Sequence, residues 1–281
     1  MTYRWIVGMA LALAVGCSAE PAMTRQVRKA GLIDVIRQQI LESVEAEKSA
    51  VLATTDEESQ AFALETRNFA AQIDKARGEL RQLIVADARR VEIEKLDAFD
   101  VAWAEFEHLD ERLLPLAVAN TNLKAIRLLS RDGTAAIDRF VDGLTAMQRS
   151  VSNPEMIRTL AAAAVAAQRS QALLFVHIPS ADDAEMTRLE QRMHDLDAEV
   201  ERCLHAARAS GQLASEPLAT TSRAWEAYQR LAAEIVRLSR QNSNVISFDV
   251  SVHEKRRAMK ECLSALAALS AVVDVGPHPR G

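Results

Sequence analysis

The sequence contains few of the residues that build β-sheets and tight turns. Only 4% of its 281 residues are aromatic, and it has 9 Gly and 7 Pro. β-Rich folds need aromatic and β-branched residues in strands and Gly and Pro in turns, so this composition argues against them. A chain rich in Ala, Leu, Glu and Arg with few helix breakers instead predicts an all-α fold.

An excess of positive charge and a large set of cysteines are also absent. The chain has 34 Lys plus Arg against 39 Asp plus Glu, which gives a formal net charge of −5, and it has 3 Cys. Without a basic excess we expect no nucleic-acid partner. The length predicts about two domains, each able to bury a core without disulfides.

Motifs for catalysis, cofactors and metals are missing from the sequence. There is no Walker loop, no dinucleotide-binding fingerprint, no Gly-x-Ser-x-Gly and no Cys-x-x-Cys-His, and the six His form no i, i+4 pair. Each of these chemistries depends on its ligands or nucleophile at a fixed spacing. We therefore expect no enzyme activity, no metal and no cofactor.

The N-terminus is predicted to be a processing signal. Residues 1–16 carry one charge, Arg4, followed by an apolar run. The run is too short to cross a hydrocarbon core of ~30 Å but fits a secretory signal. Residues 13–17, Leu-Ala-Val-Gly-Cys, resemble a bacterial lipobox, which implies a lipid on Cys17. Cleavage after Ala19 and an uncleaved anchor are the alternatives.

A lipid on Cys17 would tether the protein to a membrane through residues 17–23, because several acyl chains together give a stable anchor. We expect a location at the periplasmic face of the bacterial cell envelope, with Ser18 favouring the outer over the inner membrane. Residues 275–281 are predicted to be a disordered tail.

Apolar residues recur at spacings of three and four through most of the chain, as in residues 62–83 and 186–207. This periodicity is typical of long helices in antiparallel bundles. Caps and breakers divide the chain into eight predicted helices, at 24–54, 57–86, 89–119, 121–151, 154–176, 180–210, 214–241 and 243–273.

The two halves of the sequence repeat each other. Trp103 recurs as Trp225, and Asn120-Thr121-Asn122 recurs as Asn242-Ser243-Asn244, all at an offset of 122. Such self-similarity indicates a duplicated structural unit. We therefore predict two tandem antiparallel (up-down) four-helix bundles, formed by residues 24–152 and 153–274.

Four short features resemble the periplasmic four-helix-bundle sensor domain of methyl-accepting chemotaxis proteins. They are Glu47-Lys48, Thr55-Asp56, Trp103 in the third helix and Asn120-Thr121-Asn122. The resemblance implies a location outside the inner membrane, frequent dimerisation and small metabolites bound between helices. The chain departs from the family because it has no second transmembrane helix and no signalling rod.

Six residues are candidate ligand-binding residues. They are Glu47, Lys48, Arg169, Trp103, Trp225 and Tyr228. Glu47 lies on an apolar helical seam, where a carboxylate is costly unless it is paired or solvated, so a paired seam residue is the alternative. The aromatic residues fit core packing as well as a ligand platform, and helix capping explains the four Asn of the repeat.

Cys203 and Cys262 lie on core-like seams of the sixth and eighth predicted helices. Those helices are diagonal in an up-down bundle, and a disulfide requires Cα atoms within ~7 Å. Two buried thiols are therefore favoured, with a disulfide as the alternative in an oxidising compartment.

These features predict an envelope lipoprotein that acts as a ligand- or partner-binding sensory module without a signalling domain of its own. The expected partners are membrane lipid through acylated Cys17, a small metabolite, and an envelope receptor or a second copy of the chain. The alternatives are a structural scaffold that binds another envelope protein, and a truncated chemoreceptor sensor fragment.

Overall fold

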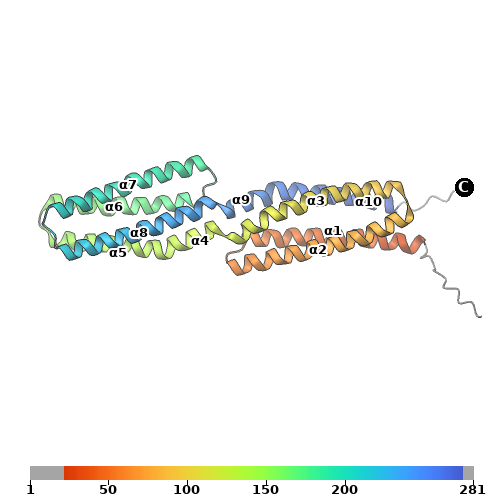
Figure 1. Cartoon of the computed structure of the whole chain (residues 1–281), viewed down its shortest axis with the longest axis horizontal. Helices are drawn as coiled ribbons and strands as arrows, with labels where there is room; N and C mark the ends of the chain where they lie inside the picture. The colour runs from red at the N-terminus through yellow and green to blue at the C-terminus, as the bar shows by residue number, and fades with distance from the viewer. Residues whose placement is uncertain (1–21, 275–281) are drawn as a thin grey trace, which may run out of the picture.

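The protein is helical throughout the part that the computed structural model describes, residues 22–274 (Figure 1). The predicted all-α fold is confirmed. The predictions for Cys17, for the signal peptide and for the tail at 275–281 concern positions outside the described residues.

Twelve helical segments follow one another in residues 22–274. In the first half they are α1 (Ala22–Leu52), α2 (Asp56–Asp87), α3 (Arg90–Ala119), α4 (Thr121–Leu128), the π-helix η1 (Leu129–Gly133) and α5 (Thr134–Ser150). In the second half they are α6 (Pro154–His177), α7 (Asp183–Ala209), α8 (Ser215–Gln241), α9 (Ser243–Asp249), the π-helix η2 (Val250–Lys255) and α10 (Arg256–Asp274).

The helix starts lie at capping residues that the sequence indicates. Thr55 accepts a hydrogen bond from the Glu58 N–H (3.1 Å). Asn153, which precedes a Pro at the first helical position, accepts one from Glu155, and Asp182 accepts one from the Ala184 N–H at 2.8 Å. These side chains satisfy N–H groups that have no partner inside the helix, which is why the predicted helix ranges agree with the structure to within a few residues.

The helices form two four-helix bundles whose composition differs from the prediction. Bundle 1 consists of α1, α2, α3 and the segment α9–η2–α10, and bundle 2 consists of α4–η1–α5, α6, α7 and α8 (Figure 1). The predicted domains 24–152 and 153–274 therefore need correction, because each half supplies its fourth helix to the other bundle.

A connection of one residue explains the exchange. Asn120 joins α3 to α4 and Asn242 joins α8 to α9, each in the left-handed conformation (φ 51° and 52°). An antiparallel helical hairpin needs a loop of about two to five residues. A single residue bends the chain without reversing it, so α4 runs on into bundle 2 and α9 runs on into bundle 1.

The two crossing segments meet at a waist, defined as residues 120–122 and 242–244. The Thr121 N–H donates to the Ser243 hydroxyl (3.0 Å), and the Ser243 N–H donates to the Thr121 hydroxyl (3.1 Å). The Asn122 and Asn244 N–H groups donate to each other's side-chain oxygens, both at 3.1 Å. The first N–H groups of α4 and α9 are thus capped by the matching residues of the other repeat, a geometry that the prediction of capping within one helix did not include.

The waist also holds the ends of neighbouring helices. The Asn120 side-chain amide donates to Asp56 at the start of α2 (3.0 Å), and Asn122 donates to the Ile178 carbonyl (2.6 Å). Asn242 donates to the Ser180 carbonyl at 2.9 Å. These bonds hold the start of α2 and the end of α6 against the waist, where the two bundles meet end to end in an elongated rod (Figure 1).

Both ends of the described chain lie at the free end of bundle 1. The Gln26 side chain of α1 donates to the Val273 carbonyl of α10 (2.8 Å). The run from α3 to α5 gives the rod a length of roughly 90 Å at about 1.5 Å per helical residue. Bundle 2 therefore lies far from both ends of the described chain.

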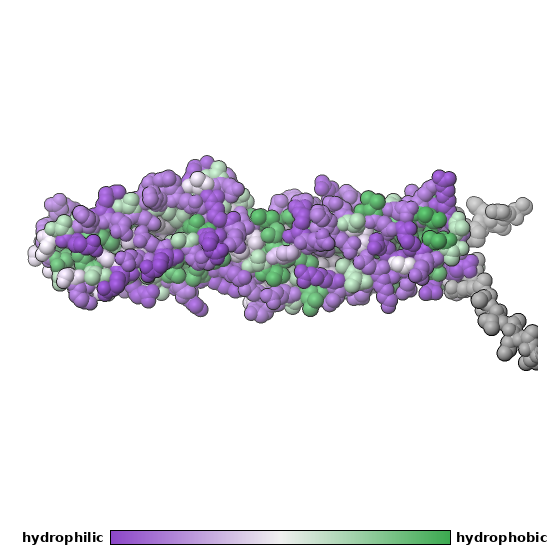
Figure 2. All heavy atoms as spheres, viewed as in Figure 1, coloured by the Kyte–Doolittle hydropathy of each residue, from purple (hydrophilic) through white to green (hydrophobic). Residues whose placement is uncertain are grey.

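The face of the rod seen in Figure 2 is mostly hydrophilic, with small hydrophobic patches near the waist and toward both ends. Within residues 22–274, one helix, α6, is long and apolar enough to cross a membrane by length and composition. It packs against α5 and α7 in bundle 2. Core helices of bundles meet the same criterion, so this is weak evidence for a membrane span.

Candidate functional site

A buried charged cluster lies in the core of bundle 1. The Lys255 ammonium is 2.6 Å from an Asp110 carboxylate oxygen and donates to the Phe106 carbonyl at 2.8 Å. It also lies 3.1 Å from the centre of the Phe106 ring, in a cation–π contact. Lys255 is 1% exposed and Asp110 is 8% exposed. Burial raises the pKa of Asp110 and lowers that of Lys255, and their ion pair opposes both shifts.

Glu47 of α1 is fully buried and lies near enough to Lys255 to feel its charge. Its carboxylate oxygens form no hydrogen bond of good geometry within residues 22–274. Burial raises the pKa of Glu47 to about 7, while the nearby Ser251 hydroxyl and the Lys255 charge offset part of that rise. Two buried carboxylates therefore lie near one buried ammonium in a core that consists mainly of aliphatic and aromatic side chains.

Such a cluster is costly for the fold. Replacing a buried ion pair by well-packed apolar residues is often neutral or stabilising, so the pair itself is weak evidence for stability. Ionisable groups with perturbed pKa values are instead common at functional sites. The cluster therefore marks bundle 1 as the candidate functional region.

A π-helix positions two members of the cluster. Ser251 and Lys255 belong to η2, which contains one wider turn within the continuous segment from α9 to α10. The other π-helix, η1, occupies nearly the corresponding place in bundle 2, where Gly133 stands 122 positions before Lys255. π-Helical turns are often found at functional sites, and here the turn brings a long basic side chain into the core.

An acidic groove of about 460 Å³ opens between α2 and α3 beside this cluster. We define it by its polar lining residues, which are Thr66, Arg67, Asp74, Glu107, Asp110 and Glu111. Burial and the neighbouring Asp74 raise the pKa of Glu107 to about 7. Asp110 connects the groove to the buried Lys255. The groove is large enough for a small molecule, since ligand pockets start near ~300 Å³.

A second buried ion cluster, at the free end of bundle 1, is fully paired. The Lys29 ammonium lies 2.6 Å from both Asp87 and Glu92, and Arg89 also pairs with Glu92. Arg25 pairs with Asp87 at 2.8 Å. These bonds hold α1, α2 and α3 together, so we assign this cluster a structural role.

Bundle 2 contains a buried aromatic cluster with unpaired donors. The rings of Trp225 and Tyr228 stack at 5.2 Å, and Phe140 packs on Trp225 at 5.0 Å. Within residues 22–274 the Trp225 N–H and the Tyr228 hydroxyl form no hydrogen bond of good geometry. Beside them the Ser170 hydroxyl donates to Asp197, whose pKa is raised by burial. An unpaired buried donor costs free energy, so this region also needs an explanation.

Near the waist, bundle 2 holds a buried histidine that is fully satisfied. His177 contacts the Ser239 hydroxyl at 2.8 Å and Glu190 at 2.9 Å through its two ring nitrogens. Arg240 donates to the same Glu190 at 2.6 Å. This network joins α6, α7 and α8, and we assign it a structural role.

The structure separates the predicted ligand-binding residues. Glu47 is buried in the cluster, whereas Lys48 and Arg169 are exposed on the outer surfaces of α1 and α6. Trp103 is buried in a stack with Phe99 and Phe106, and Trp225 and Tyr228 lie in the equivalent stack of bundle 2. The aromatic residues thus pack in the core, which was the alternative to a ligand platform. Lys48 and Arg169 do not line the interior of either bundle.

The two cysteines of the described chain lie in different bundles. Cys203 belongs to α7 in bundle 2 and Cys262 to α10 in bundle 1, and both are free. Because the fourth helices are exchanged, these two residues are not diagonal partners in one bundle, and the disulfide alternative is corrected. Cys262 is fully buried, as predicted, while Cys203 is half-buried.

The sequence reading missed Lys255, Asp110 and Glu107. Their signal was present, because Lys255 extends the seam of Met259 and Cys262 by one turn, and Asp110 follows Phe106 at a spacing of four. The sequence analysis identified only one charged residue on an apolar seam, Glu47. Extending each seam to its full length would have found the other two members of the cluster.

No group of three potential metal ligands comes together within residues 22–274. Comparisons of the chain with protein-family models, with curated proteins and with solved structures found no match. The resemblance to chemoreceptor sensor domains therefore stays a prediction from the sequence, and function must be argued from the site.

Proposed function

We propose that the chain is a ligand-binding module of the bacterial cell envelope, and that its acidic groove binds a small organic cation. Four carboxylates and one arginine line the groove. Three of the carboxylates already have partners: Arg77 and Trp103 contact Asp74, Lys255 pairs with Asp110, and His108 lies 3.7 Å from Glu111. Glu107 is left without an ion pair in the described part of the chain, next to Asp74.

The position of Glu107, half-buried in the groove beside Asp74 and without an ion pair within residues 22–274, is the observation that carries this proposal. Burial and the nearby Asp74 charge hold a proton on Glu107 up to a pH of about 7. A bound ammonium or guanidinium group would replace that proton and relieve the repulsion between the two carboxylates. Such exchange of a proton for a cation is a binding function and requires no catalytic group.

The proposal predicts pH-dependent binding. A cation binds the ionised form of Glu107, so affinity should rise as the pH increases through about 7 and level off above it. Isothermal titration calorimetry at pH 6, 7 and 8 with butylamine, putrescine and guanidinium measures this dependence. Affinity that does not change with pH would contradict the role of Glu107.

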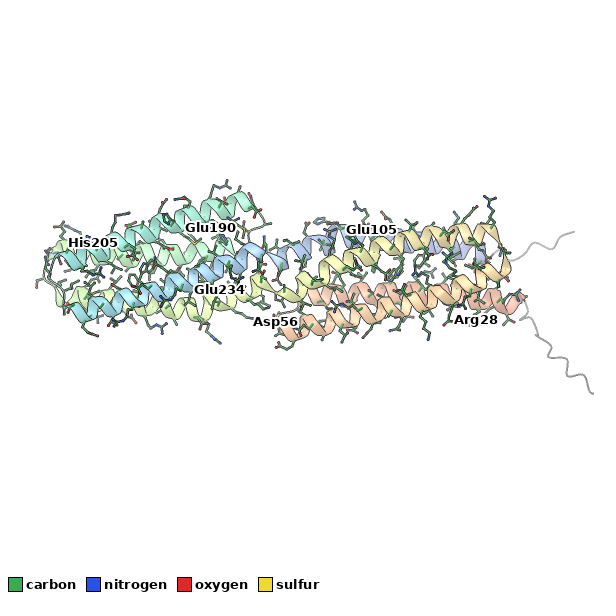
Figure 3. All side chains as sticks on the ribbon, viewed as in Figure 1. Arg28, Asp56, Glu105, Glu190, His205 and Glu234 are labelled. Carbon is green, nitrogen blue, oxygen red and sulfur yellow. The ribbon has the colours of Figure 1, made fainter. Side chains whose placement is uncertain are left out.

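Glu107→Gln and Glu105→Gln form a matched pair for this test. Both residues belong to α3, but Glu105, which Figure 3 labels on that helix, is exposed and is not among the residues that line the groove. We expect Glu107→Gln to weaken cation binding about tenfold, because one charged contact to the ligand is lost. A tenfold change corresponds to ~1.4 kcal/mol of binding free energy. Glu105→Gln should bind like the parent chain.

We further propose that a lipid on Cys17 anchors the protein. Both ends of the described chain lie at the free end of bundle 1. An anchor at Cys17 would therefore place bundle 1 next to the membrane and direct bundle 2 away from it. Palmitate labelling with Cys17→Ser as the control tests this arrangement, and an unlabelled parent chain would contradict it.

A scaffold function is the remaining alternative. Failure of every cation to bind, together with a stoichiometric protein partner recovered from envelope extracts, would favour a scaffold that binds another envelope protein.

A further inference from the structure

The acidic groove between α2 and α3 also contains a positive charge. Arg67 of α2 lines the groove and is exposed to solvent. Its guanidinium group forms no ion pair or hydrogen bond within residues 22–274. The positions one turn away on α2, 63, 64, 70 and 71, are Ala or Leu, so its own helix offers no carboxylate. The groove therefore holds an unpaired guanidinium group as well as the unpaired carboxylate of Glu107.

These two unpaired groups lie at opposite ends of the groove. Glu107 lies close enough to Asp74 to feel its charge. Arg67 stands seven residues before Asp74 on α2, which is about 10 Å along the helix axis. Because α3 runs antiparallel to α2, Leu114 and Pro115 of α3 line the end at which Arg67 stands. The groove is thus negative at one end and positive at the other.

The middle of the groove offers a ligand mainly methyl groups. Ala70 and Ala71 form its α2 wall between the two charged ends. The carboxylate oxygens of Asp110 are buried and already paired with an ammonium group. Glu111 is an exposed residue of the rim and lies 3.7 Å from His108. A molecule that fills the groove therefore needs an apolar centre between two charged ends.

Bundle 2 does not repeat the two unpaired charges. At the offset of 120 that aligns α2 with α7, Thr187 takes the place of Arg67. At the offset of 122 that aligns α3 with α8, Gln229 takes the place of Glu107. The four-helix framework forms without these charges in bundle 2, so packing of the repeated helices does not account for their presence in bundle 1.

We propose that the groove binds an ω-amino acid, a molecule with an ammonium and a carboxylate group at opposite ends of a short apolar chain. The ammonium group pairs with Glu107, and the carboxylate accepts hydrogen bonds from Arg67, whose planar guanidinium group matches carboxylate geometry. The methylene chain lies along Ala70 and Ala71. The inference rests on the proposed function, because the ammonium group occupies the same cation site.

The length of the groove favours a chain of about five methylene groups. In extended 6-aminohexanoate the nitrogen and the carboxyl carbon are about 7 Å apart, since an extended chain advances ~1.2 Å per bond. A hydrogen bond of about 2.8 Å at each end then reaches both charged side chains. 3-Aminopropanoate is too short to contact both.

Isothermal titration calorimetry of the full chain at pH 8, where Glu107 is ionised, tests the ligand class. Pentylamine is 6-aminohexanoate without its carboxylate, and hexanoate is the same chain without its ammonium group. We expect 6-aminohexanoate to bind at least tenfold more tightly than pentylamine, hexanoate or 3-aminopropanoate. Equal affinities for 6-aminohexanoate and pentylamine would overturn this inference while cation binding still stood. Binding of none of these compounds would overturn both proposals.

Arg67→Gln and Lys75→Gln form a matched pair for the positive end. Both residues are exposed on α2, but Lys75 does not line the groove. We expect Arg67→Gln to weaken 6-aminohexanoate binding about tenfold without weakening pentylamine binding, and Lys75→Gln to bind both like the parent chain. Circular dichroism checks that each variant remains helical. Unchanged 6-aminohexanoate binding in Arg67→Gln would overturn the proposal, as would an equal loss for both ligands.

Discussion

The two bundles share one framework but differ in the chemistry of their interiors. Bundle 1 buries Lys255 beside Asp110 and near Glu47. Bundle 2 has Gly133 at the position that matches Lys255 and Ala232 at the position that matches Asp110, both at the offset of 122. Bundle 1 leaves carboxylate oxygens without hydrogen bonds, whereas bundle 2 leaves an indole N–H and a phenol hydroxyl unpaired among the described residues. The two bundles therefore share a scaffold, while a few core substitutions give each bundle its own set of buried polar groups.

The largest expected effect comes from removing the charge that only bundle 1 contains. Lys255→Met leaves Asp110 and Glu47 buried without a counter-charge, so we expect a loss of about 3–5 kcal/mol in unfolding free energy. Urea denaturation followed by circular dichroism measures this loss. Lys260→Met, an exposed position on the same helix, should stay within about 0.5 kcal/mol of the parent chain.

A double variant makes two positions of bundle 1 apolar, as the matching positions Gly133 and Ala232 of bundle 2 are. Asp110→Leu combined with Lys255→Met removes both charges of the pair, so most of the lost stability should return. A double variant as unstable as Lys255→Met would mean that packing around the ammonium stem, and not the charge, causes the loss.

The second effect is pH-dependent and belongs to Glu47. Its pKa is raised from 4.5 to about 7, so its ionisation destabilises the folded state as the pH rises from about 4.5 to 7, with no further change above 7. Relative to Glu47→Gln, the parent chain should therefore lose roughly 3 kcal/mol across this range. Urea melts from pH 4 to 8 test this, with the exposed Glu45→Gln as control. Parallel stability profiles for the parent and Glu47→Gln would contradict it.

The third comparison concerns the two halves of the waist. The Asn122 side chain donates to Ile178 and to Asn242 and accepts from the Asn244 N–H. The Asn244 side chain donates to Asn120 and accepts from the Asn122 N–H. Asn244 is also less buried than Asn122. We expect Asn122→Ala to cost roughly 2–3 kcal/mol and Asn244→Ala roughly 1–2 kcal/mol. Chemical denaturation of the two variants gives both values, and equal losses would show that the waist is energetically symmetric.

The waist also shows how far the sequence could predict this fold. Seam spacing and the caps at Thr55, Asn153 and Asp182 marked the helices to within a few residues, because those signals are local. The exchange of fourth helices depends on the direction of the chain after Asn120. That information was present in the one-residue connection, which is too short for a hairpin, but the repeat suggested two separate domains.

The candidate sites were less predictable than the helices for a physical reason. Glu47 could be found because a single carboxylate interrupts an apolar seam of its own helix. The acidic groove depends on residues of two helices, such as Asp74 of α2 and Glu107 of α3, whose proximity becomes visible only when α2 and α3 are placed side by side. Lys48 and Arg169 were selected by sequence resemblance, and their helical phase places them on the surface.

The smallest expected effect concerns close packing that only bundle 2 has. A Cβ at Gly143 of α5 would clash with the Thr221 side chain of α8, and the residues at the matching positions of bundle 1 are Ala265 and Phe99. Gly143→Ala should therefore destabilise the protein by about 1–3 kcal/mol despite the better helix propensity of Ala. Ala265→Gly should cost about 1 kcal/mol through propensity alone. Adding Thr221→Ala to Gly143→Ala should restore stability, because the obstructing atoms are gone. A double variant no more stable than Gly143→Ala would show that the clash with Thr221 does not cause the loss.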